Sequence, residues 1–348
     1  MKFGLMVDLG RVDPDTSMQQ VIRNTTEIVK AADAVGFDMV FCGEHHGHER
    51  TIAPAPFTLL THWAAQTTNV RLGTAVLCAP YWHPIRLAGE ASLFDHLSGG
   101  RLELGIGRGA YPYEFARMAA GIPPEVARQQ LDELLPALRG LWEGNYAHDG
   151  TMWKFPSTTA TPRPLSPEGP PIWVSARHPD VFKTAVQNRC DVMVAPLAMG
   201  FEEVESLRER LDTAVSVVGN GHIPRMMVLR NTYVASEGED PMLPVHTYRR
   251  DQGTFQNLYS TDGKVDNGWV EYIDPATSTS PSQYDNEDIA RNMMFGTVDV
   301  VLEKMSAYEK AGTDVYLYDA GWGLDLDTEL ASIERFGSEV IPKFRGNA

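Results

Sequence analysis

Reactive side chains gather where a short apolar run of the sequence ends. The run that ends at Cys42 is followed by Glu44, His45, His46 and His48. Histidine and carboxylate groups transfer protons, and they also ligate zinc or iron. Neighbouring side chains of an extended segment point in opposite directions, so we expect one of these histidines to face a site. We interpret the group as general acid or base chemistry. A metal site, or a purely structural role of Glu44 and His46 at the rim of the fold, stays open.

A second group follows a later strand-like run and is rich in glycine. Its pattern is Gly105-x-Gly107-x-Gly109, which differs from the dinucleotide-binding pattern GxGxxG. Missing side chains instead let a flat ring or a phosphate approach the backbone, and Arg108 offers a planar, permanently charged donor. We therefore interpret this segment as part of a ligand-binding site.

Arg177 and His178 stand at the start of a predicted helix. A helix N-terminus favours an anion, and these side chains add positive charge to it. In a chain with a formal net charge of -16, this indicates an anion site, most simply for the phosphate of a cofactor. The alternative is that Arg108 and Arg177 only pair with surface carboxylates.

The elements that carry these groups alternate between short β-branched runs and longer segments of helical period, which is typical of a parallel sheet wrapped by helices. Eight strands are predicted, at residues 2–7, 37–42, 70–78, 101–106, 171–175, 192–195, 225–234 and 313–318. Repeats of about 30 residues match an α/β fold of the (β/α)8 TIM-barrel type, as a single domain over residues 1–348. The reactive groups then share the carboxyl end of the barrel, where barrel active sites lie.

One long segment breaks this rhythm. Residues 236 to about 290 are polar, yet they contain Tyr248, Phe255, Tyr259, Trp269 and Tyr272. Structureless insertions of this length are usually lids or binding loops. A disordered surface loop is the alternative, and the aromatic residues favour a lid.

The composition limits the classes of binding partner and the cellular compartment that we expect. The 30 basic against 46 acidic residues should repel nucleic acid and anionic membranes. Cys42, Cys78 and Cys190 form no CxxC pair, which suits a reducing compartment. No signal peptide and no run of about 20 apolar residues is recognised, so we expect a cytoplasmic protein without membrane spans.

Five segments resemble the bacterial luciferase-like flavin monooxygenases, in order and with matching spacing: MKFGLM, GFDMVFCGEHH, NVRLGTAVL, HPIRLAGEASLFDHLSGGRLELGIGRGAY and GTVDVVLEKMSAYEKAGTDVYL. The resemblance implies a TIM barrel that binds reduced FMN supplied by a separate NAD(P)H:flavin reductase. It implies that O2 is activated as a flavin C4a-hydroperoxide and that one oxygen atom enters a small organic substrate. Relatives often dimerise, so a homodimer is expected.

The resemblance also implies roles for single residues. His45 matches the catalytic acid or base, Arg108 the arginine that holds the FMN phosphate, and Ala75-Val76 a cis peptide under the flavin ring. Arg177 and His178 depart from the small or hydroxyl residues usual at their positions. The expected cofactor-binding residues are Ala75, Val76, Gly107, Arg108, Ala110, Tyr111, Ser175, Ala176, Arg177 and His178. No metal is expected.

Three other functions are weighed against this one. A deazaflavin (F420) dependent hydride transferase uses a similar barrel but consumes no oxygen. A non-catalytic flavin-binding barrel would bind oxidised flavin without turnover. A metal-dependent hydrolase would contain stoichiometric metal. Gly107 stands where luciferase carries a reactive cysteine, which argues against light emission. The substrate itself is left open among aldehydes, cyclic ketones, amines and N-heterocycles.

Overall fold

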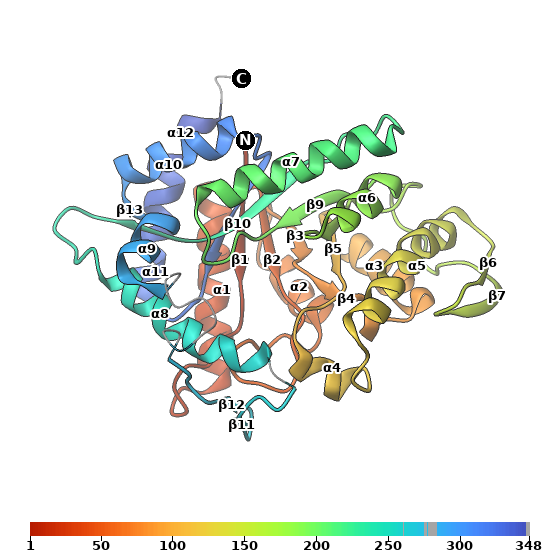
Figure 1. The fold of residues 1–348 in the computed structure, drawn as a ribbon, viewed down its shortest axis with the longest axis horizontal. Coiled ribbons are helices and arrows are strands. Elements are labelled where there is room, and N and C mark those ends of the chain that lie inside the picture. Colours follow the sequence, from red (N-terminus) through yellow and green to blue (C-terminus); the bar gives the residue numbers. More distant parts are fainter. Residues whose placement is uncertain (260, 275–276, 278–283, 346–348) are drawn as a thin grey trace.

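Parallel strands form a closed barrel at the centre of the molecule (Figure 1). The structure, a computed structural model, describes residues 1–259, 261–274, 277 and 284–345. Within these residues eight strands form the wall of the barrel. The barrel closes because β10 pairs with both β9 and β14. The strands are β1 (Lys2–Val7), β2 (Met39–Cys42), β3 (Arg71–Thr74), β5 (Leu102–Gly107), β8 (Ile172–Ser175), β9 (Asp191–Val194), β10 (Met226–Ala235) and β14 (Val315–Ala320). The expected (β/α)8 fold is confirmed.

The third predicted strand is divided into two. Residues 70–78 form two short strands, β3 and β4 (Leu77–Cys78), which both pair with β5. The peptide bond from Ala75 to Val76 lies between them and is cis, as the family resemblance implies.

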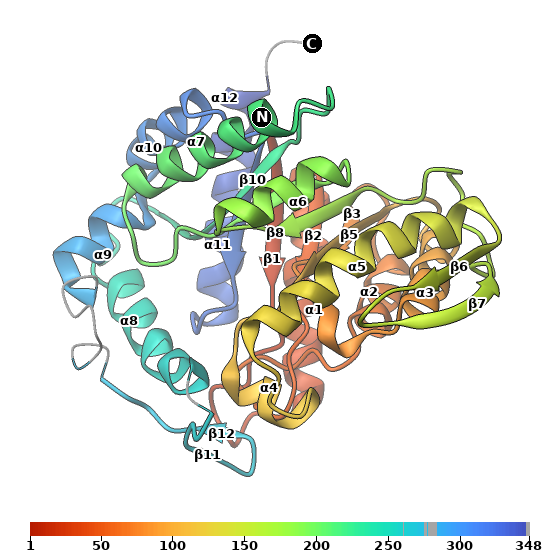
Figure 2. The ribbon, with the colours of Figure 1, turned by 45° about the vertical axis from the view of Figure 1, so that its right-hand side comes forward.

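Helices cover the outside of the barrel (Figures 1 and 2). They are α1 (Met18–Val35), α2 (Pro56–Ala64), α3 (Pro84–Leu97), α4 (Pro112–Met118), α5 (Pro124–Glu143), α6 (Pro179–Gln187), α7 (Phe201–Val218), α8 (Leu243–Phe255), α9 (Asn286–Asn292), α10 (Val298–Lys310), α11 (Leu326–Arg335) and α12 (Ile341–Phe344). In α1 the Ser17 side chain accepts the Gln20 N–H at the first turn, and Gly36 ends the helix with a φ of 98°. None of the helices in the described ranges has the length and apolar character that a membrane span needs.

The barrel interior is filled in layers. Large apolar side chains occupy its middle: Met6, Phe41, Trp173, Met193 and Leu317. Gly73 leaves room for them, because a Cβ there would lie 2.4 Å from the Phe41 ring. Side chains alternate along a strand, so Asp8, Gly43 and Asp319 face the axis at the carboxyl end.

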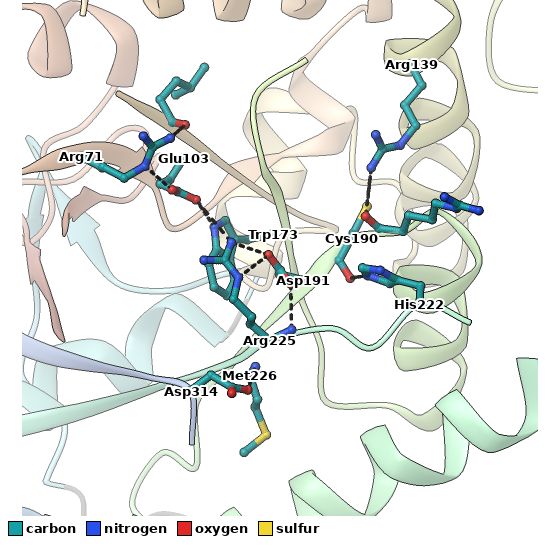
Figure 3. Close-up of polar contacts among 12 residues, drawn as sticks. Arg71, Glu103, Arg139, Trp173, Cys190, Asp191, His222, Arg225, Met226 and Asp314 are labelled. Atoms are coloured by element: carbon teal, nitrogen blue, oxygen red, sulfur yellow. Dashed lines mark hydrogen bonds and ion pairs between the residues drawn. The ribbon is translucent and has the colours of Figure 1, made fainter. Parts of the chain in front are cut away.

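Charged residues close the amino end (Figure 3). Glu103 on β5 accepts the Trp173 indole N–H at 2.6 Å and pairs with Arg71. Arg225 binds Asp191 with distances of 2.6 and 2.9 Å, and its guanidinium lies 4.5 Å from the centre of the Trp173 ring. Glu103 is buried, so this network forms the floor of the barrel.

Two segments outside the regular β/α repeat contain secondary structure of their own. Residues 147–170 include most of a hairpin of β6 (Tyr146–Asp149) and β7 (Lys154–Thr158). The insertion from residue 236 contains α8, the 3-10 turn η2 (Gln256–Tyr259) and a small hairpin of β11 (Val265–Asp266) and β12 (Trp269–Val270). It is therefore not structureless, because buried side chains such as Val245 and Tyr248 anchor α8. Residues 260, 275–276 and 278–283 of the expected lid lie outside the described residues.

Candidate active site

Small residues on three neighbouring strands line one side of the carboxyl end. Ala75 and Val76 follow β3, Gly107 ends β5, and Ser175 ends β8. A Cβ at Gly107 would lie 2.7 Å from Val76 Cγ2 and 3.3 Å from Ser175 Cβ, so these residues are in close contact. Ser175 follows the inward-facing Trp173 by two positions, yet it is exposed. This side of the mouth is open, and its surface suits a flat ring that lies against backbone and small side chains.

Arg108 and Ala110 directly follow this surface and are both exposed. No group within the described residues forms a hydrogen bond or ion pair with the Arg108 guanidinium. The alternative that Arg108 pairs with a surface carboxylate is therefore not supported. A charged donor beside the mouth that has no partner in the described part of the chain is available to bind an anion such as a phosphate.

Arg177 differs from Arg108 because it is already engaged. It donates to the Ala195 carbonyl at 3.2 Å and lies 3.3 Å from the Glu203 carboxylate. The His178 side chain caps α6, accepting the Asp180 N–H through Nδ1 at 3.4 Å. Ala176 is buried and donates its N–H to the Met193 carbonyl. Arg177 and His178 therefore lie at the helix start that was predicted, with part of their bonding capacity used.

His45 contacts a buried carboxylate that the sequence analysis did not single out. Its Nδ1 lies 3.1 Å from Glu114 Oε1, and Glu114 also accepts the His46 backbone N–H at 2.8 Å. The other edge of the imidazole faces the end of β2, since a Cβ at Gly43 would lie 3.3 Å from His45 Nε2 and 3.5 Å from Asp8 Oδ1. His45 therefore has one nitrogen held by Glu114 and one near the barrel mouth.

The electrostatics of this pair favour a charged imidazole. Burial works against the proton on His45, but the hydrogen bond and charge of Glu114 outweigh it and raise the pKa of His45. Burial also opposes ionisation of Glu114, yet its hydrogen bonds with His45 and His48 lower its pKa to about 2. Burial lowers the pKa of His48, whose side chain is fully buried. The proton that makes one of these groups cationic is therefore expected on His45, with His48 neutral and Glu114 ionised.

His45, His48 and Glu114 also offer three ligand atoms within 4.8 Å of one another, a spacing that could hold a metal ion. One hydrogen bond opposes that interpretation. His48 Nδ1 accepts the Thr51 backbone N–H at 3.3 Å, so a neutral His48 carries its proton on Nε2, the nitrogen that would have to bind the metal. The arrangement fits proton transfer better than metal ligation.

Glu44 and His46 belong to the rim. Glu44 accepts the Cys78 N–H at 2.7 Å and the Trp82 indole N–H at 2.9 Å, and His46 lies 3.3 Å from it. These bonds hold the segment after β2 against the segment after β3. The structural role that the sequence left open for these two residues is the one that the contacts support.

The insertion covers the site from the opposite side. The Tyr111 ring lies 5.2 Å from the His45 ring and 5.5 Å from each of Phe255 and Tyr259, measured between centroids. Arg50 binds Asp251 of α8 at 2.6 and 2.7 Å, 201 positions away in the sequence. Figure 2 shows α8 and the β11–β12 hairpin close to α4, the helix that carries Glu114.

Carboxylates also face the mouth at the ends of two adjacent strands. Asp319 accepts the Asn231 side-chain N–H at 2.8 Å, and Asp8 accepts the Gly43 N–H at 3.3 Å. Burial, followed by the nearby charges of Asp8 and Asp251, raises the pKa of Asp319 well above its usual range. The mouth therefore combines an acid/base pair, aromatic rings and acidic groups.

Sequence reasoning missed Glu114, Arg50 and Asp251. Glu114 had a usable signal, because an acidic residue in the first turn of the helix after a barrel strand lies near the mouth. Arg50 and Asp251 had none, since they are paired only through the docking of the insertion.

Comparison with known proteins identifies the family of this chain. The luciferase-like monooxygenase family matches residues 1–315. The oxygenase component of the flavin-dependent trigonelline monooxygenase of Acinetobacter baylyi is 38% identical over 344 residues, which cover 99% of this chain and 96% of that protein. The chain therefore belongs to the luciferase-like monooxygenase family. It is a flavin-dependent monooxygenase.

Two solved structures share the whole fold. The monooxygenase RslO1 of Streptomyces bottropensis is 26% identical with a TM-score of 0.78, and the match covers 99% of this chain and 100% of that one. The oxygenating constituent of 3,6-diketocamphane monooxygenase from Pseudomonas putida, in complex with FMN, is 22% identical with a TM-score of 0.78, covering 99% and 98%. The second likeness concerns the fold alone.

Proposed function

We propose that this chain is the oxygenase component of a two-component system, in which a separate NAD(P)H:flavin reductase supplies reduced FMN. The chain would use it with O2 to insert one oxygen atom into a small organic substrate. The observation that carries the proposal is the His45–Glu114 pair, 3.1 Å apart, at an open barrel mouth lined by small residues. The Acinetobacter relative, named as an oxygenase component, supports the division of labour.

The described residues fit FMN in two places. Ala75, Val76, Gly107 and Ser175 would lie against the flavin ring, because together they form a surface of backbone and small side chains. Arg108 would bind the phosphate, with Arg177, His178 and the start of α6 beside it. Ala110 and Tyr111 follow Arg108, and Ala176 would contribute through its backbone. When bound, reduced FMN would supply the activation of O2, as the family resemblance implies.

His45 would control the proton at the reacting centre. Its Nε2 edge lies beside Gly43 at the barrel mouth, while Nδ1 is held by Glu114. A protonated imidazole in this position can donate from Nε2 to an oxygen atom of the reaction and take a proton back afterwards. Transfer of this kind typically contributes about 10²–10⁴-fold to a rate.

The insertion would limit access of water. Phe255 and Tyr259 contact Tyr111, and Arg50 fixes α8 through Asp251. A water-poor site protects a reactive oxygen species from wasteful decay and strengthens electrostatic interactions. We therefore assign the described part of the insertion to a cover, with its remaining residues outside the described structure.

Oxygen uptake with FMN, a flavin reductase and NADH tests this function. Mixing the reduced-FMN complex with O2 in a stopped-flow instrument should give a transient flavin absorbance that is shortened or lost in His45→Ala. Trigonelline, the substrate named for the Acinetobacter relative, is the first compound to test for coupled oxygenation. Direct reoxidation without a transient, identical in His45→Ala, would refute the mechanism and favour a deazaflavin-dependent hydride transfer.

A further inference from the structure

His48 is a buried histidine beside the acid/base pair that none of the roles above uses. Its Nε2 lies 3.4 Å from Glu114 Oε1, the same oxygen that His45 Nδ1 and the His46 N–H approach. The side chain is fully buried, and this long contact with Glu114 is not a well-formed hydrogen bond, so Nε2 is only weakly satisfied among the described residues. A buried polar atom of this kind requires a functional or structural reason.

The backbone fixes which nitrogen of His48 carries the proton. Thr51 donates its N–H to Nδ1 at 3.3 Å, which requires a lone pair on Nδ1. A neutral imidazole with this bond has its hydrogen on Nε2, directed at Glu114. Burial lowers the pKa of His48, which agrees with a neutral ring. His48 can therefore donate only from Nε2, and the Thr51 backbone N–H fixes the orientation of its ring.

We propose that His48 is a positioning residue, which donates from Nε2 to Glu114 Oε1 and thereby holds the carboxylate in the geometry that binds His45 Nδ1. Three donors then converge on one oxygen atom: the His46 N–H at 2.8 Å, His45 at 3.1 Å and His48 at 3.4 Å. The His46 N–H alone would leave the side chain of Glu114 free to rotate about its terminal bond. Because His48 stays neutral, it adds a donor without competing with His45 for the proton.

Two variants separate this role from simple packing. Gln has an amide that reaches the place of Nε2 and can donate to Glu114, whereas Asn places its side-chain oxygen near Nδ1 and can only accept from Thr51. If His48 acts through Glu114, His48→Gln still holds the Glu114 carboxylate against His45, and His48→Asn does not. If His48 only anchors the loop through Thr51, the opposite order is expected. His62→Asn, at an exposed histidine of α2, is the control for handling and labelling.

The first measurement is NMR of the flavin-free protein with 15N-labelled histidine. We expect the wild type to show His48 as the Nε2–H form and a slowly exchanging His45 Nδ1 proton, which persists in His48→Gln and is lost in His48→Asn. A His48 proton on Nδ1, or a charged His48, would overturn the proposal even if every variant failed to fold. Because no flavin is present, this result does not depend on the proposed function.

The second measurement separates binding from reaction. The reduced-FMN complex of His48→Asn is mixed with O2, and the rate of flavin reoxidation is measured. This rate should change about tenfold from the wild-type rate, as expected when one oriented hydrogen bond is lost. The affinity for FMN should stay within about threefold, because His48 lies away from the residues that would hold the flavin. Equal losses in His48→Gln and His48→Asn, or a loss of FMN affinity alone, would contradict a positioning role.

Discussion

The two ends of the barrel use the same residue types in opposite ways. At the amino end Glu103, Arg71, Arg225 and Asp191 are joined by hydrogen bonds and ion pairs, and Trp173 completes the network (Figure 3). At the carboxyl end Arg108 has no partner among the described residues. Fully paired charges close the floor and stabilise the fold, whereas unpaired or unevenly paired charges at the mouth are available to a ligand.

The largest expected effect is at the mouth. His45→Ala should lower the rate of oxygenation about 10²–10⁴-fold, because it removes the proton donor at the reacting centre. The thermal unfolding midpoint should change less than the rate, since Glu114 keeps the His46 N–H and its contact with His48. Oxygen uptake with coupled product analysis measures the first, and calorimetry the second. A small loss of rate would move the acid/base role to another residue.

At the floor we expect a large loss of stability and a small change in rate. Glu103→Gln should lower the free energy of unfolding by about 1–3 kcal/mol, because it removes the carboxylate that pairs with Arg71 and binds the Trp173 N–H, while Arg225 keeps Asp191. The rate per folded molecule should stay near that of the wild type. Denaturant titration gives the stability, and activity normalised to bound flavin gives the rate. If activity fell while stability held, the two ends would not be independent.

Arg108→Ala is expected to weaken FMN binding, an effect of intermediate size. Losing a charged donor to a phosphate should weaken FMN binding by about 1.5–3 kcal/mol, roughly 10- to 100-fold. Arg177→Ala should cost less, because Arg177 already bonds to Ala195 and Glu203. Fluorescence titration with FMN measures both, and Arg86→Ala, at an exposed ion pair of α3, is the matched control. Equal effects for Arg108 and Arg177 would mean that they share the phosphate.

The same contrast explains what could be predicted from the sequence. Strand positions were predictable, because buried parallel strands are apolar runs and each active-site group follows one of them. His45 and Arg108 were found for the same reason. Glu114 lies on a helix and Asp251 on the insertion, so their contacts with His45 and Arg50 depend on tertiary packing. The floor network was missed too, because the strand starts that carry Arg71, Asp191 and Arg225 meet only when the barrel closes.

A smaller loss of rate than in His45→Ala is expected for Glu114→Gln, which keeps the shape of the side chain and removes its charge. Without the carboxylate, the pKa of His45 should fall, so the imidazole loses its proton at lower pH and the rate near neutral pH should drop about tenfold. A pH profile of oxygenation and NMR titration of His45 measure both changes.

Stability should show the same pair through its pH dependence. The raised pKa of His45 stabilises the fold below about pH 6.5, its unfolded value, and this contribution is lost as the pH rises through the folded pKa. Glu114, with its pKa lowered to about 2, contributes above its unfolded value of about 4.3, and this is lost as the pH falls towards 2. The difference in unfolding free energy between wild type and Glu114→Gln should therefore be largest between about pH 4.3 and 6.5 and shrink on both sides. If this difference in unfolding free energy were the same from acid to alkaline pH, His45 and Glu114 would not be a charged pair. The mouth would then differ from the floor, where the paired groups are charged.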